Sequence, residues 1–117
     1  MTSATAFRIS AVFGFFAVAL GAFGAHGLKP LLEKYGTADA WHTAALYHLV
    51  HAVTMLALAS REPMRTWPWR LFAIGVTIFS GSLYALAITN MKMLGAITPI
   101  GGVCLLAGWI GLTLKPR

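Results

Sequence analysis

The sequence predicts an all-α integral membrane protein, a four-transmembrane-helix bundle with a short interfacial helix in the first loop. Of its 117 residues, 58% are hydrophobic and only 10% are charged, whereas a soluble domain carries about 25% charged residues. Four apolar segments follow one another, and each has about the 20 residues that a helix needs to cross about 30 Å of hydrocarbon. The length indicates a single transmembrane domain, residues 1–117.

The four predicted spans cover about residues 6–25, 40–60, 69–89 and 93–114. The first span has Arg8 ahead of an apolar core, a pattern that signal peptides share. We expect it to be retained as a helix, because the apolar run reaches Ala25 without a good A-x-A cleavage site. The connection between the last two spans, Asn90–Lys92, is so short that these spans form an antiparallel hairpin.

The first loop carries an amphipathic pattern of its own. Its apolar residues recur at helical spacing, while Pro30 suits a first helical turn and Gly36 a stop. We therefore predict a short helix on the outer membrane surface, with Thr37 or Asp39 as the N-cap of the second span. The apolar positions are Leu28, Leu31, Leu32 and Tyr35, and the charged ones are Lys29, Glu33 and Lys34.

Lysine and arginine lie unequally on the two sides of the predicted spans. Cytoplasmic loops carry an excess of these residues, so both termini are predicted to be cytoplasmic. The net charge of +6 does not indicate nucleic-acid binding, because the basic residues stand singly between apolar spans and form no basic stripe. The termini and the second loop hold Arg8, Arg61, Arg65, Arg70, Lys115 and Arg117, whereas the other loops hold Lys29, Lys34 and Lys92.

Four tryptophans, Trp41, Trp67, Trp69 and Trp109, fall near the ends of the predicted spans. Tryptophan is enriched at both membrane–water interfaces, where its ring sits at headgroup level. We therefore expect these four side chains to form aromatic belts.

Small residues recur along three of the spans at the spacing of a helix face. Water-driven burial cannot bring helices together in lipid, so such residues allow the close backbone approach on which packing depends. Because more than one face carries them, we also expect a homo-oligomer, each ridge serving either an internal contact or a subunit interface. The predicted packing residues are Gly14, Ala17, Gly21, Gly24, Gly81, Gly101, Gly108 and Gly111.

Polar side chains inside the spans form the candidate site. His48 and His51 lie one helical turn apart in the second span, and ionisable groups at membrane depth are costly and commonly functional. Pro99 donates no backbone hydrogen bond, which leaves the Gly95 carbonyl in need of another donor. Counting residues along antiparallel spans places these groups in the outer half of the membrane, in a polar cluster of His26, Tyr47, His48, His51, Ser80, Ser82, Tyr84, Thr98 and Pro99.

Three interpretations of this cluster compete. It is interhelical hydrogen bonding that fixes the bundle, or a pocket open to the outer side for a small polar solute, proton or lipid, or a metal or haem site. His48 and His51 share one helix and cannot be two trans ligands of one haem, and a zinc site needs a third ligand such as His26 or His42. We therefore predict no metal and no cofactor.

Enzymatic chemistry has little support in the sequence. The three carboxylates, Glu33, Asp39 and Glu62, lie in loops or at span edges, and no acid–base pair, HExxH run or Ser-His-Asp set occurs at depth. The single cysteine, Cys104, excludes a disulfide framework within one chain. We predict no catalytic residues.

Four stretches, GAFGAHGL (21–28), WHTAALYHLVHA (41–52), FSGSLYAL (79–86) and LGAITPIGG (94–102), resemble the small four-helix membrane family called YgdD/YwdK in bacteria and transmembrane protein 256 in animals. The resemblance implies the four-span architecture and supplies no activity, cofactor or functional residue. We expect a structural or accessory component of a bacterial inner membrane, with a carrier or pore as the alternative and a metal- or haem-binding protein as the third interpretation.

Overall fold

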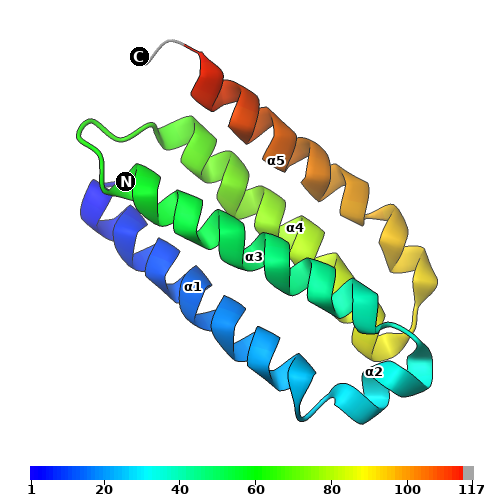
Figure 1. Ribbon diagram of the computed structural model, residues 1–117. Helices are drawn as coiled ribbons and strands as arrows, with labels where there is room; N and C mark the ends of the chain where they lie inside the picture. The colour runs from blue at the N-terminus through cyan, green and yellow to red at the C-terminus, as the bar shows by residue number, and fades with distance from the viewer. Residues whose placement is uncertain (115–117) are drawn as a thin grey trace.

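The computed structural model describes residues 1–114 and contains four helical segments long and apolar enough to cross a membrane. They are α1 (Ser3–Ala25), α3 (Ala38–Ala59), α4 (Thr66–Thr89) and a last segment in which the 3₁₀ helix η1 (Lys92–Ala96) leads into α5 (Thr98–Thr113). Figure 1 shows both chain ends and the α3–α4 loop at one end of the molecule, with α2 and η1 at the other. The all-α, four-span prediction is confirmed, and most boundaries agree within three residues.

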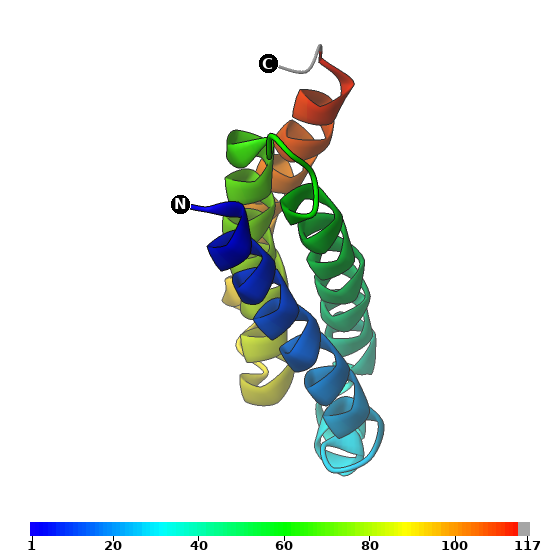
Figure 2. The same ribbon diagram turned by 90° about the vertical axis from the view of Figure 1, so that its left-hand side faces the viewer.

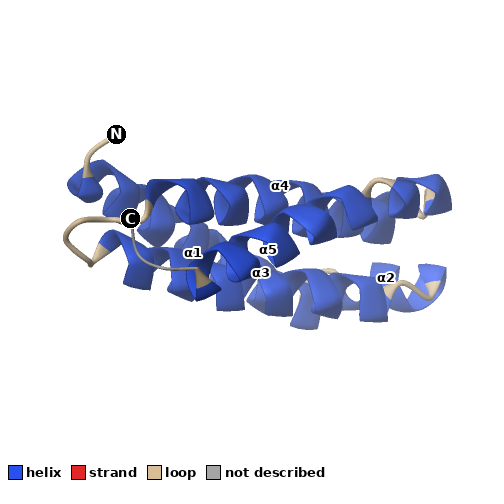
Figure 3. Cartoon of the chain, turned by 90° about the horizontal axis from the view of Figure 1, so that it is seen from above, coloured by secondary structure: helices blue, strands red, loops and turns tan. Residues whose placement is uncertain are grey.

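The long helices pack as a row rather than as a closed ring. α1 packs on α3, α3 on α4 and α4 on α5, whereas no Cα of α1 comes within 8 Å of one in α4 or in the described part of α5. The same holds between α3 and α5. Figures 2 and 3 show the helices aligned along one direction, and the Cα extents are 48 × 25 × 19 Å. Contacts across these two gaps are therefore made by side chains, such as the Trp69–Ser10 and Trp109–His51 hydrogen bonds.

The predicted short helix of the first loop is present as α2 (Lys29–Tyr35). It buries Leu32 and keeps Lys29 and Lys34 exposed, and it ends at Gly36, whose φ of 68° suits glycine. Thr37 occupies the N-cap position of α3, but its side chain makes no capping bond. Instead its hydroxyl donates to the Ala87 carbonyl at 2.8 Å, which ties this loop to α4.

The fourth span differs from the prediction at its start. Pro99 was predicted inside one continuous helix, yet α5 begins at Thr98, so Pro99 lies in its first turn. The first N–H groups of a helix have no partner within it, and proline therefore costs nothing at this point. Gly95 belongs to the preceding 3₁₀ helix, so its carbonyl and Pro99 do not share one continuous α-helix as predicted.

The apolar core lies in two parts, one toward each end of the molecule. The larger part, near the chain termini, centres on Phe72, Met55 and Trp69. The smaller part, beside α2, comprises Leu32, Trp41 and Ala87.

Several predicted packing glycines stand where a side chain would collide with a neighbouring helix. A Cβ at Gly101 would lie 2.8 Å from the Gly75 carbonyl of α4, and one at Gly108 would lie 2.7 Å from the Phe72 ring. Gly111 and Gly24 make room for the rings of Trp67 and Trp41 in the same way, and Ala17 is buried. A Cβ added at Gly21, in contrast, would lie 4.0 Å from the Ala45 Cβ, an ordinary van der Waals contact.

Gly14 and Gly81 differ from the other predicted packing glycines. A Cβ added at either residue would have no neighbour within 4 Å, so neither glycine packs closely against another described helix of this chain. Gly75 is a close-packing glycine that the spacing of small residues did not indicate, since its Cβ would lie 2.7 Å from Leu105.

Candidate functional site

His48 joins α3 to α4 through a side-chain hydrogen bond. Its Nδ1 lies 2.9 Å from the hydroxyl oxygen of Tyr84. The imidazole also packs edge-on to Phe13 of α1, with ring centroids 6.2 Å apart, and the Tyr84 ring lies 4.6 Å from that of Trp41. His48 is therefore buried where α1, α3 and α4 meet.

His51 joins α3 to α5. Its Nδ1 lies 2.8 Å from the Tyr47 carbonyl one turn earlier, and the indole N–H of Trp109 donates to its Nε2 at 2.9 Å. A carbonyl only accepts and an indole N–H only donates, so this arrangement fixes a neutral imidazole with its proton on Nδ1. Both ring nitrogens are thereby engaged, and the Nε2 lone pair that a metal would need is directed at Trp109.

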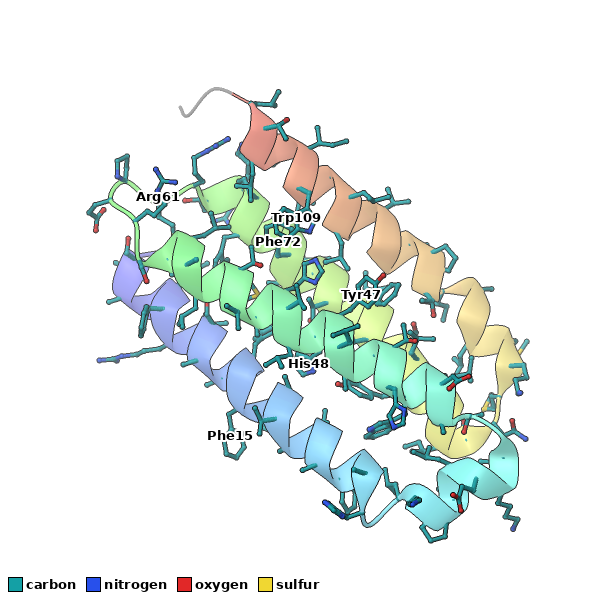
Figure 4. All side chains as sticks on the ribbon, viewed as in Figure 1. Phe15, Tyr47, His48, Arg61, Phe72 and Trp109 are labelled. Carbon is teal, nitrogen blue, oxygen red and sulfur yellow. The ribbon has the colours of Figure 1, made fainter. Side chains whose placement is uncertain are left out.

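The two histidines do not share one pocket, although one turn separates them. In Figure 4 the His48 side chain lies on the α1 side of α3, whereas Tyr47, Phe72 and Trp109 lie on the α5 side. The His51 ring packs against the last two, with centroid distances of 5.4 and 5.7 Å. The predicted single cluster is therefore divided into separate bridges between different helix pairs.

Other predicted site residues form further bridges or none. Ser82 and Thr98 are 2.6 Å apart through their hydroxyl oxygens and connect α4 to the start of α5. Ser80 donates to the Ala44 carbonyl of α3 at 2.8 Å. The other three members, His26, Tyr47 and Pro99, are exposed. The Tyr47 ring nevertheless packs on Phe79 of α4, with ring centroids 4.8 Å apart.

Two tryptophans that the belt prediction assigned to the interface are buried instead. Trp41 and Trp69 are each only 3% exposed. A buried indole N–H usually finds an acceptor: Trp41 donates to the Leu20 carbonyl and Trp69 to the Ser10 hydroxyl, both at 2.9 Å on α1. The belt prediction rested on position along the span alone. The hydroxyl of Ser10, which lies within a stripe of small residues, could have indicated a polar partner for a buried tryptophan.

These bonds account for the buried polar side chains of the bundle. Among the described residues, no buried side-chain nitrogen or oxygen lacks a hydrogen-bond partner. In the same part of the chain, no three histidine, cysteine, aspartate or glutamate side chains gather as a metal-binding group.

A groove of about 280 Å³ lies beside His48, with walls from α1 and α4. Apolar side chains dominate its lining, which differs from the polar pocket that one of the three competing interpretations placed at this depth. Its residues are Val12, Phe13, Phe16, Leu20, His48, Val76, Thr77, Ser80, Gly81 and Tyr84.

Comparison with known proteins identifies the family. Residues 20–102 match the family described as "Protein of unknown function (DUF423)". The chain belongs to this family of membrane proteins. All four stretches on which the resemblance rested fall inside the matched range, so the expected family is confirmed.

Bacterial relatives cover most of the chain. The UPF0382 membrane protein YwdK of Bacillus subtilis is 42% identical over an alignment of 110 residues, with a coverage of 87% of each chain. A UPF0382 membrane protein of Haemophilus influenzae is 44% identical over 112 residues, 87% of this chain and 85% of the relative. The UPF0382 inner membrane protein YgdD of Escherichia coli is 39% identical over 116 residues, 93% of this chain and 86% of the relative. No solved structure matches this chain.

Proposed function

We propose that the protein is a structural or accessory component of the bacterial inner membrane, without catalytic activity of its own. One observation carries the proposal: the polar side chains buried in the described bundle are all engaged in hydrogen bonds. The bonds of His48, His51 and Trp69 each connect two different helices. Such bonds contribute about 0.6–2 kcal/mol each in a membrane, so together they favour one arrangement of the four helices.

The positions of the carboxylates support the absence of catalysis. A catalytic histidine is usually oriented by a buried acid. Here Glu33, Asp39 and Glu62 are exposed near the ends of the molecule, and His51 is oriented by a carbonyl and an indole.

The test compares stability with transport. His48→Ala and His51→Ala should each lower the melting temperature of the purified protein in detergent, because each removes an interhelical bridge and leaves a cavity. His42→Ala is the matched control, since His42 is an exposed histidine of the same helix. Flux of small solutes and protons into proteoliposomes should equal that of empty vesicles for every variant. A wild-type flux that either bridge variant abolishes without a change in melting temperature would refute the structural role.

The second candidate is a carrier for a lipid or a small polar solute, and the groove beside His48 favours it. Tyr84 and His48 line this groove, so a ligand headgroup entering between α1 and α4 would meet two polar groups. Lipid scrambling between the leaflets of vesicles is the assay, with Gly81→Leu, which would fill the groove, as the blocking variant. A metal- or haem-dependent function stands third, and colourless, metal-free purified protein would contradict it.

We further propose that both termini face the cytoplasm. Arg8, Arg61, Arg65 and Arg70 lie toward the end of the molecule that carries the chain termini, and cytoplasmic ends carry such an excess. Lys115 and Arg117 lie outside the described residues. With Cys104→Ser as background, Asn90→Cys should react with an impermeant maleimide on intact cells, whereas Glu62→Cys should react only after the cells are opened. The reverse pattern would overturn the orientation.

Self-association is also part of the proposal. Gly14 and Gly81 meet no side chain of the described chain, although glycine at such positions permits a second helix to approach closely. We expect the purified protein to run as a homo-oligomer when its mass is measured by light scattering in detergent. Gly14→Leu and Gly81→Leu should convert it to the monomer, and a monomeric wild type would contradict the proposal.

A further inference from the structure

A large pocket lies near the end of the molecule that carries the termini, opposite the outer half in which the polar cluster was predicted. Its volume is about 670 Å³. Its walls come from the end of α3, the α3–α4 loop, the start of α4 and the end of α5, and Figure 4 places Arg61 at this loop. The lining residues are Leu58, Arg61, Glu62, Pro63, Met64, Arg65, Thr66, Trp67, Leu112 and Leu114.

The pocket exists because α3 and α5 stay apart here. The backbones of these two helices do not approach within 8 Å in the described residues. Deeper in the bundle the Trp109–His51 hydrogen bond spans the same gap. Leu58 lies seven residues beyond His51 along α3, or about 10 Å nearer the surface. The pocket is therefore apolar where Leu58 and Leu112 line it and charged at the loop that carries Arg61 and Glu62.

One of the charged groups of the pocket, the Arg65 guanidinium, is held in place by a hydrogen bond. The Arg65 guanidinium donates through Nη2 to the Gly111 carbonyl near the end of α5, at 2.9 Å, and a guanidinium has further N–H donors for a ligand. The Trp67 ring packs where a Cβ on Gly111 would stand, so Trp67 and Arg65 both contact α5 at Gly111. Two arginines against one glutamate give the lining a net formal charge of +1.

We propose that this pocket binds the headgroup of an anionic phospholipid. Its phosphate would pair with Arg61 and Arg65, and its acyl chains would lie along the apolar wall that includes Leu58 and Leu112. Arginine presents a planar fork that matches phosphate oxygens, and basic pockets between transmembrane helices on the cytoplasmic side accept such headgroups. The bilayer supplies a ligand that combines both chemistries, whereas a free anion would leave the apolar wall without a partner.

The experiment measures retention of phosphatidylglycerol by the full-length protein in mixed micelles. Native mass spectrometry counts bound phosphatidylglycerol in competition with phosphatidylcholine and phosphatidylethanolamine. Wild-type protein should retain phosphatidylglycerol preferentially. Arg61→Gln should weaken retention about fivefold, and Arg61→Gln with Arg65→Gln about 25-fold, the change expected from losing one and two surface arginine contacts.

A matched control separates a site from general attraction. Arg8→Gln with Arg70→Gln removes the same charge toward the same end of the molecule, but neither residue lines the pocket, so retention should stay within about twofold of wild type. Equal losses in the two double variants would overturn the proposal, as would unchanged retention in Arg61→Gln. Because Arg61 is exposed, Arg61→Gln should fold normally, and this variant alone tests the proposal if Arg65→Gln unfolds the protein.

Two further arms test the identity of the ligand. Inorganic phosphate at millimolar concentration should not displace the lipid, because it makes no contact with the apolar wall. Displacement by phosphate would contradict the lipid proposal and indicate a site for a soluble anion. Equal retention of phosphatidylethanolamine would contradict the requirement for a net negative charge on the lipid.

Discussion

Gly101→Ala should separate α4 from α5, because the added methyl group would meet backbone rather than a movable side chain. Its Cβ would lie 2.8 Å from both the Gly75 carbonyl oxygen and the Phe79 Cα, and closer still to the Phe79 amide nitrogen. Reaching an ordinary separation of 3.4 Å requires the helices to part by at least 0.6 Å at this point. A gap of that size forfeits about a quarter or more of each neighbouring dispersion contact.

The expected destabilisation follows from two opposing terms. Overpacking of this kind costs about 1–3 kcal/mol, and rigid backbone places Gly101→Ala toward the upper part of that range. Replacing a helical glycine by alanine also stabilises the helix by up to about 1 kcal/mol, because alanine has the higher helix propensity. The free energy of unfolding should therefore fall by about 2 kcal/mol, measured by denaturant titration in detergent with tryptophan fluorescence as the signal.

Gly102→Ala is the control, because it gains the same helix propensity one residue further along α5. Its Cβ would meet only the Phe79 ring, at an ordinary 3.7 Å, so its stability should equal or exceed that of the wild type. If Gly101→Ala and Gly102→Ala unfold at the same denaturant concentration, close backbone packing does not hold α4 to α5.

Three more predictions concern the bridges. Tyr84→Phe should lower the free energy of unfolding by about 0.6–1.7 kcal/mol in the same titration, while Tyr47→Phe, at an exposed position, should leave it unchanged; equal effects would contradict the Tyr84 bridge. Trp109→Phe should lower it by a similar amount by removing the donor between α5 and α3, and additivity with a His51 substitution in a double-mutant cycle would show that the two do not interact. Gly24→Ala should displace the Trp41 indole from α1, seen as a red-shifted emission, and an unshifted spectrum would refute that packing.

The spans could be predicted from the sequence because their cause is local. Lipid requires about 20 apolar residues in a row with internally satisfied backbone, and that requirement is visible in composition alone. The spacing of Gly101, Gly108 and Gly111 indicated a close-packed face for a similar reason, since residues three and four apart share one side of a helix. Gly75, which completes the contact on α4, stood outside any regular stripe.

The direction of each polar side chain could not be predicted, because it depends on which helix lies opposite. His48 and His51 differ by about 60° around α3, and that angle suffices to send one toward Tyr84 and the other toward Trp109. The partner of His48 lies on α4, which packs directly on α3, whereas the partner of His51 lies on α5, whose backbone stays more than 8 Å from that of α3. The long helices pack in the order of the chain, but that order alone does not show which side chains of α3 meet α4 and which reach α5.

The two indole bonds on α1 also bear on the choice between scaffold and carrier. Trp69 holds α1 near the end that carries the chain termini, through Ser10, and Trp41 holds it near the opposite end, through the Leu20 carbonyl. The groove beside His48 lies between these two attachments. A carrier cycle that widened the groove would have to move α1 away from α4 and break at least one of them. Because an unpaired indole N–H in hydrocarbon costs several kcal/mol, α1 resists that motion, and the arrangement suits a fixed scaffold better than an alternating carrier.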